Sequence, residues 1–166
     1  MALRTIRLEG DPVLEKKCRK VETMTPRLRQ LVEDMLETMY DANGVGLAAP
    51  QVGILRQIVV IDVGEGPIVL VNPVMTMQEG EQTGDEGCLS VPGLAGQVTR
   101  PNHVIVEAFD ENMKPVRVEG EELLARALCH ELDHLNGVMY TSLVEGELHE
   151  AQYEEDEEGE EDEGNK

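Results

Sequence analysis

Five consecutive residues carry the clearest chemistry in the chain: His130-Glu131-Leu132-Asp133-His134, which read H-E-x-x-H. On a helix, residues four apart lie on the same face, so both imidazoles can point a nitrogen at one metal ion. Glu131 would then lie beside that ion, where a carboxylate can take the proton of a bound water. The pentapeptide therefore predicts a hydrolytic metal centre with His130 and His134 as two of its ligands.

A site of this kind needs a third protein ligand and one open position. In the pattern H-E-x-x-H-x-x-G-x-x-H the third ligand would be a His at position 140, but the chain keeps Gly137 and has Tyr140. A downstream Glu, as in thermolysin-like sites, would come from the acidic C-terminal part, where nothing fixes its position. His103 lies in a predicted strand and His149 begins the acidic part. Cys88 is the strongest candidate, since a thiolate is a good ligand for a divalent transition metal.

Two helices are predicted to position these groups. Helix formers precede the pentapeptide, and Asn136-Gly137 is predicted to end the helix, because glycine suits the left-handed position that follows a helix. An earlier helix begins at Thr25-Pro26, with Thr as N-cap and Pro in the first turn, and ends near residue 43. Its apolar residues follow one stripe with a period near 3.6: Leu28, Leu31, Val32, Met35, Leu36 and Met39.

Strands are predicted where β-branched residues gather between turn signals. The predicted ranges are 57–63, 68–71, 74–78, 103–110 and 115–119, the last two as a hairpin. Helices and strands are segregated, without βαβ alternation, so we predict an α+β fold. In that fold, antiparallel strands pack around a central metal-binding helix that carries the H-E-x-x-H sequence.

Residues 44–51 are predicted to form a glycine-containing loop. The loop matches the dinucleotide-binding pattern G-x-G-x-x-G/A only formally. That pattern needs a strand before it and a helix after it, whereas here a helix precedes and Pro50 follows closely. The glycines more plausibly let the backbone approach a ligand or a packed segment. Gln51 ends this loop, and from the residues alone it is equally well a solvated side chain or a hydrogen-bond donor at a site.

Composition restricts the partners and the compartment. The formal charge is −20, and twelve acidic residues with a single Lys fall in residues 145–166. This argues against binding DNA or an anionic membrane by simple attraction. We predict a catalytic domain over residues 1–144 and a disordered acidic tail over residues 145–166. Three widely spaced Cys, with no signal peptide and no apolar run of about 20 residues, favour the cytoplasm.

Three motifs resemble those of peptide deformylases and occur in the family's order. They are GVGLAAPQ at residues 44–51, EGCLS at residues 86–90 and HELDH at residues 130–134, and GDPVL at residues 10–14 is similar to the family's N-terminal signature. The resemblance extends from about residue 3 to about residue 143. It implies a metal-dependent hydrolase that removes the N-formyl group from the N-terminal methionine of newly synthesised polypeptides.

The resemblance also implies roles for individual residues. Cys88, His130 and His134 would hold one divalent ion, most often Fe(II), with Ni, Co or Zn able to replace it. Glu131 would act as general base and then acid while metal-bound water attacks the formyl carbon. The remaining groups implied are the Gln51 amide and the Leu89 backbone N–H at the formyl oxygen. The substrate contacts implied are Val45 and Gly46 at the methionine side chain, Gly46 and Gly87 at the substrate backbone, and Arg100, which occupies the place of a family arginine near the site.

Two departures from the family pattern bear on these expectations. Cys129 stands before His130 where Gln is common, and a thiol there either adds sensitivity to oxidation or simply packs. The acidic tail replaces a basic C-terminal helix, so any proximity to the ribosome would not come through the tail. Two alternatives remain: a metallopeptidase of the H-E-x-x-H type, and an inactive binding protein for formyl peptides or metal that acts through its tail.

Overall fold

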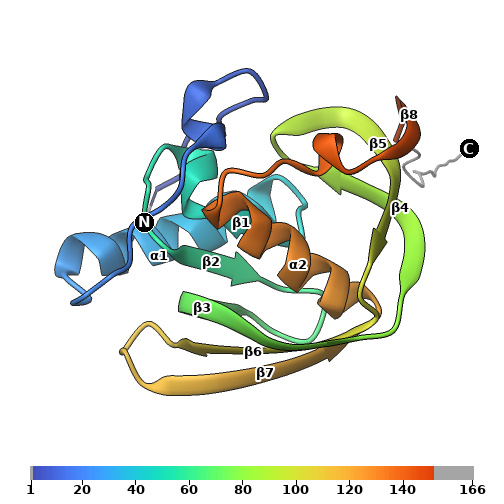
Figure 1. Ribbon diagram of the computed structural model, residues 1–166. Helices are drawn as coiled ribbons and strands as arrows, with labels where there is room; N and C mark the ends of the chain where they lie inside the picture. The colour runs from blue at the N-terminus through green and yellow to red at the C-terminus, as the bar shows by residue number, and fades with distance from the viewer. Residues whose placement is uncertain (1, 152–166) are drawn as a thin grey trace, which may run out of the picture.

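Two antiparallel sheets and two α-helices make up the part of the chain that the structure, a computed structural model, describes, residues 2–151. The five-stranded sheet has the order β1-β2-β3-β6-β7 and the three-stranded sheet the order β4-β5-β8 (Figure 1). The helices are α1 (Pro26–Asp41) and α2 (Leu123–Leu135). The strands are β1 (Gly46–Ala48), β2 (Ile58–Ile61), β3 (Ile68–Glu79), β4 (Gln82–Cys88), β5 (Val91–Arg100), β6 (His103–Phe109), β7 (Pro115–Glu121) and β8 (Glu145–Glu150). The predicted α+β class with antiparallel strands is confirmed.

The N-terminal helix α1 begins as its sequence predicts. The Thr25 hydroxyl accepts a hydrogen bond from the Leu28 N–H at 3.2 Å, and Pro26 occupies the first turn, where a missing N–H costs nothing. Its apolar stripe, including Met35 and Met39, is buried against β1 and β2. The helix ends before Asn43, which adopts a φ of 58°. This helix therefore supports the short strand β1 from behind.

Helix α2 carries the H-E-x-x-H sequence and contacts strands of both sheets. It packs against β1, β2, β6 and β7 of the five-stranded sheet and against β5 of the other (Figure 1). Its stop is sharp, because Gly137 adopts a φ of +75°. A Cβ at Gly137 would lie 2.6 Å from the backbone of Glu15, so only glycine fits between the helix end and the N-terminal segment.

Most predicted strands are present, with different bounds. The ranges 68–71 and 74–78 form one continuous strand, β3, whose pairing with β6 shifts after Val71. Asn72 lies at that shift with a φ of 53°, and its side chain bonds both the N–H and the carbonyl of Val21 at 2.8 Å. The hairpin β4-β5 on either side of Cys88 was not predicted. Its four glycines obscure the alternation of apolar and polar residues on which a strand prediction depends.

The disordered tail was predicted to begin at residue 145, and for its first six residues this is wrong. Glu145–Glu150 forms strand β8, which pairs with β5 at the edge of the three-stranded sheet. The backbone pairs Leu94 with Glu150 and Ala95 with His149, and the Ala151 N–H continues to the Gly93 carbonyl at 2.9 Å. Main-chain pairing with exposed side chains lets an acidic segment join a sheet without burying charge. The rest of the predicted tail, residues 152–166, lies outside the described residues. Between residues 2 and 151, no helix is long and apolar enough to cross a membrane.

Candidate metal centre

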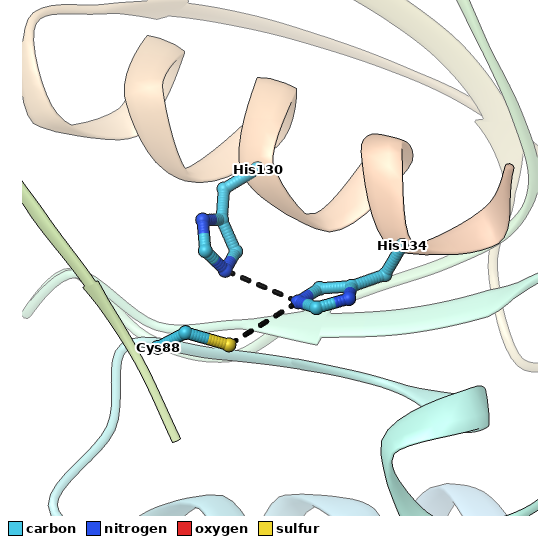
Figure 2. A group of neighbouring side chains, drawn as sticks. All are labelled: Cys88, His130 and His134. Atoms are coloured by element: carbon cyan, nitrogen blue, oxygen red, sulfur yellow. Dashed lines mark hydrogen bonds between the residues drawn. The ribbon is translucent and has the colours of Figure 1, made fainter. Parts of the chain in front are cut away.

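Helix α2 and the end of β4 bring three potential metal ligands together (Figure 2). The Cys88 Sγ lies 3.4 Å from the His134 Nε2, which lies 3.2 Å from the His130 Nε2. Each of the three residues offers one ligand atom, and all three atoms lie within 4.8 Å of one another. The two His come from consecutive turns of α2, as predicted, and Cys88 comes from a strand 42 residues earlier. Among the described residues, this is the one such group.

Two of the three distances between the ligand atoms fit a tetrahedral metal ion. Around an ion with bonds of about 2.0–2.3 Å, tetrahedral ligand atoms lie roughly 3.3–3.7 Å apart. The two distances that involve the His134 Nε2 are close to this range. The donor set of one thiolate and two imidazoles suits iron, nickel, cobalt or zinc.

The two histidines have pKa values shifted in opposite directions. Burial lowers the pKa of His134 well below its usual value, which keeps it in the neutral form that binds metals. Burial also lowers the pKa of His130, but hydrogen bonds to Cys88 and Glu86 outweigh this and raise it well above the usual value.

A buried carboxylate orients His130 from behind. The Glu86 Oε2 lies 2.5 Å from the His130 Nδ1, so the ring donates there and turns its Nε2 toward Cys88 and His134. Burial raises the pKa of Glu86, but hydrogen bonds from His130 and Arg100 outweigh it and lower the pKa to about 2. No role for Glu86 was predicted from the sequence. Recognition of β4 as a strand could have suggested one, since residues two apart on a strand tend to share a face.

Glu131 is buried beside the three ligands and is not one of them. Its side chain is 4% exposed, and its Oε1 has no hydrogen-bond partner within residues 2–151. Burial raises the pKa of Glu131 to about 7. A carboxyl group with this pKa can both accept and release a proton near neutral pH, as general acid–base chemistry requires.

Gly46 is the close neighbour of this carboxyl group. A Cβ built on Gly46 would overlap the Glu131 Oε2 and would lie 2.9 Å from its Cδ. Gly46 lies on β1, the edge strand of the five-stranded sheet, and is paired with Ile61. The missing side chain therefore makes room for Glu131 at the site.

Gly46→Ala is expected to lower kcat of a hydrolytic reaction at this site about 100-fold, because a displacement of about 1 Å at a reacting group can cost that much. The free energy of unfolding should change little, since the added Cβ overlaps only the end of the Glu131 side chain. Gly10→Ala is the control: Gly10 has a φ of +104° and nothing within 4 Å of its Cβ position. It should lower the thermal midpoint and leave kcat unchanged. Equal activity of Gly46→Ala and the wild type would contradict this reading of Gly46.

Gln51 is buried and faces the site, so the first of its two possible roles, a solvated loop residue, is wrong. It is 1% exposed, and its side-chain carbonyl accepts the Ala48 N–H at 2.9 Å. Its amide donates to the Ser90 Oγ at 3.0 Å and lies 3.5 Å from the Cys88 Sγ. The short 3-10 helix Ala49–Val52 therefore presents one amide N–H₂ group directly beside the three ligands.

Four further residues were predicted at the site, and three of them are chain neighbours of residues already described: Gly87 and Leu89 flank Cys88, and Val45 precedes Gly46. Leu89 follows Cys88 at the turn between β4 and β5, and its side chain covers Gly44. Val45 is 43% exposed, and Gly87 is exposed on β4. Arg100 is only 6% exposed.

The guanidinium of Arg100 is taken up by two carboxylates. It bonds Glu86 through Nη2 at 2.5 Å and Nε at 3.0 Å, and it bonds Asp133 through Nη1 at 2.7 Å. Arg100 therefore lies on the Glu86 side of His130, away from the ligand atoms. The sequence predicted that Arg100 contacts the substrate; we assign it instead the role of holding the Glu86 carboxylate.

Other cysteines and histidines are excluded from this group by position. Cys129 is 7% exposed within the main core cluster, and burial raises the pKa of its thiol to about 11, so it packs as a small apolar residue. His103 lies on β6 between Glu79 and Glu119. His149 lies on β8 near Asp85.

Comparisons with known proteins identify the family of the chain. The sequence matches the family described as polypeptide deformylase over residues 3–148. A peptide deformylase of Agathobacter rectalis is 66% identical over 95% of this chain and 100% of that protein. One of Lachnoclostridium phytofermentans is 59% identical over 95% of this chain and 99% of that protein.

Solved structures of similar proteins share the fold. The crystal structure of a peptide deformylase from Legionella pneumophila has a TM-score of 0.84 and 44% identity, covering 86% of each chain. That of Synechococcus elongatus in complex with actinonin has a TM-score of 0.82 and 45% identity, covering 85% of this chain and 78% of that one. Fold, sequence and site agree, and the chain is an enzyme that belongs to the peptide deformylase family.

Proposed function

We propose that this enzyme removes the N-formyl group from the N-terminal methionine of new polypeptides, with one divalent metal ion held by Cys88, His130 and His134. The convergence of these ligand atoms beside the buried Glu131 carries the proposal. A divalent ion bound there supplies Lewis acidity and lowers the pKa of a coordinated water.

Glu131 moves the protons of the reaction. It is placed to accept one from water as the formyl carbon is attacked and to deliver one to the departing amine, and its pKa near 7 suits both steps. The Gln51 amide and the Leu89 backbone N–H are proposed to donate to the formyl oxygen as negative charge develops there. The products are formate and a free amino terminus.

The substrate backbone is proposed to lie between two strand edges. β1 is an edge of the five-stranded sheet and β4 an edge of the three-stranded sheet. Gly46 and Gly87 lie on these strands, and an extended peptide pairs readily with unpaired strand edges. Val45, with the turn of α2 before His130, would border the methionine side chain.

The metal is proposed to be Fe(II), with Ni, Co or Zn as substitutes. A thiolate and two imidazoles accept all four ions, and affinity order alone does not decide which ion is bound in cells. We further propose that the enzyme acts in the cytoplasm on nascent chains, in transient proximity to the ribosome. The three Cys residues are all free, as in proteins of a reducing compartment.

Deformylation of a short formyl-Met peptide under anaerobic conditions, with metal content measured on the same sample, tests the proposed function. Formate release with about one iron or nickel per chain is the expected result. An unformylated peptide is the control, because a metallopeptidase of the H-E-x-x-H type would cleave its amide bonds. Metal bound without formate release would favour a binding role or another substrate.

Removal of residues 152–166 is expected to leave kcat/KM for the formyl peptide unchanged. Every residue proposed for the site lies between Val45 and His134, and a cut after Ala151 keeps β8 and its hydrogen bond to Gly93. A longer truncation from Glu145 is the matched comparison: it removes β8, exposes the edge of β5 and should lower the thermal midpoint. Loss of activity in the shorter truncation would favour the alternative that the protein acts through its acidic tail.

A further inference from the structure

A line of buried polar groups extends from the metal ligands toward the start of β4. The Glu86 carboxylate accepts the His130 N–H through Oε2, and Arg100 bonds both of its oxygens. A second guanidinium, that of Arg126, donates through Nη1 to the Glu86 Oε1 at 2.8 Å. Beyond Arg126 lies the Gln82 Oε1, 3.4 Å from Nη2. Glu86 therefore stands between two cations.

Arg126 connects three elements at once. It lies on α2 one turn before His130, so the two residues share a face of the helix. Its Nη1 also donates to the Val98 carbonyl on β5 at 3.1 Å. Gln82 lies on β4, and its amide bonds the Glu122 carbonyl at 2.8 Å, at the beginning of α2. Arg126 is 8% exposed, so a single buried guanidinium joins the helix to both strands of the hairpin that presents Cys88.

We propose that Arg126 is a positioning residue for the metal centre, which fixes the Glu86 carboxylate so that its Oε2 receives the His130 Nδ1–H. This inference rests on the proposed function. Arg100 bonds both oxygens and Arg126 adds a second donor to Oε1, so the carboxylate is held in one orientation and the His130 ring keeps its Nε2 directed toward His134. The guanidinium also ties α2 to β4 and so limits the distance between the two ligands on α2 and Cys88.

Burial gives a second reason for Arg126. Glu86 is 5% exposed, and its Oε1 receives donors from Arg100 and Arg126. Without Arg126, this oxygen would lose one of its two cationic donors, and the Val98 carbonyl would lose the Nη1–H that it accepts. Because buried polar groups are costly when their partners are removed, the groups around Glu86 would be expected to rearrange.

The experiment compares Arg126→Met and Arg126→Lys with the wild type by titration of the metal-free protein with Co(II) against a chromophoric chelator. The visible spectrum of bound Co(II) reports the ligand geometry. Arg126→Met should raise the Kd for Co(II) about 10- to 100-fold, as loss of an outer partner of a metal ligand commonly does, and should shift the absorption bands. Arg126→Lys should lose less affinity for Co(II) than Arg126→Met, since it keeps the positive charge. It should still lose some, since one ammonium group cannot bond Glu86, Val98 and Gln82 at once.

Arg4→Met is the matched control, because Arg4 forms a partly buried ion pair with Asp34 at 3.0 Å, joining the N-terminal segment to α1. It should lower the thermal midpoint and leave the Kd and the spectrum unchanged. A wild-type Kd and spectrum in folded Arg126→Met would overturn the proposal. If that variant does not fold, the same result in Arg126→Lys would overturn it. Failure of the wild type to bind Co(II) would instead overturn the proposed metal site.

Discussion

Glu131→Gln is expected to reduce formate release by about 10²- to 10⁴-fold, the contribution that a positioned general acid–base commonly makes. The amide has nearly the shape of the carboxyl group but cannot take a proton from water. Metal content should stay near one per chain, since Glu131 is not among the three ligands. The thermal midpoint should not fall, because burial already disfavours the charged form of this group, whose pKa is about 7.

Glu37→Gln is the matched control for this change. Glu37 lies on α1, and its Oε1, like that of Glu131, is buried without a hydrogen-bond partner among the described residues. This variant should keep both metal and activity. Full activity of Glu131→Gln, measured as formate release at saturating peptide, would show that the proposed proton transfers are wrong.

Cys88→Ala is expected to abolish deformylation through loss of the metal. Two imidazoles on one helix would remain, and the affinity should fall by more than the roughly 10- to 100-fold that follows loss of an outer partner. Metal analysis after dialysis, together with the rate of formate release, measures both effects. The fold should persist, because Cys88 is only half-buried at the end of β4.

Cys129→Ala separates this effect from the loss of a thiol in general. Cys129 packs in the core on the same helix as the two histidines, so its truncation should cost about 1 kcal/mol of stability while metal and activity remain. One metal per chain and unchanged activity in Cys88→Ala would remove Cys88 from the ligand set.

The sequence predicted the helical part of the site more fully than the strand part. The spacing of His130 and His134 places them on one face of any helix, and the glycine after α2 ends the helix at a predictable point. The hairpin around Cys88 escaped prediction because β4 and β5 are rich in glycine, and because β8, which completes their sheet, comes from far along the chain. Pairing between distant segments leaves little trace in either segment alone.

Long-range contacts also explain the residues whose roles were misjudged or missed. Arg100 carries a charge, which in isolation fits a substrate contact, but it ends β5, and its guanidinium bonds Glu86 on β4 and Asp133 on α2. Glu86 and Arg126 are 40 residues apart and meet only once α2 packs beside β4. The start of the tail was misplaced for the same reason, since β5 provides an edge that the acidic residues after position 144 do not reveal.

The proposed metal ligands come from the three-stranded sheet and from helix α2, so a bound ion would link the enzyme's lifetime to the supply of metal. Cys88 belongs to the three-stranded sheet, whereas His130 and His134 lie on the helix that packs mainly against the five-stranded sheet. An ion that binds all three ligands binds only the folded chain, and it stabilises that chain in proportion to the logarithm of the free ion concentration. During metal starvation the population of newly made enzyme would therefore open more often and become more accessible to proteases. Scarcity of the ion would then lower the amount of enzyme as well as its activity.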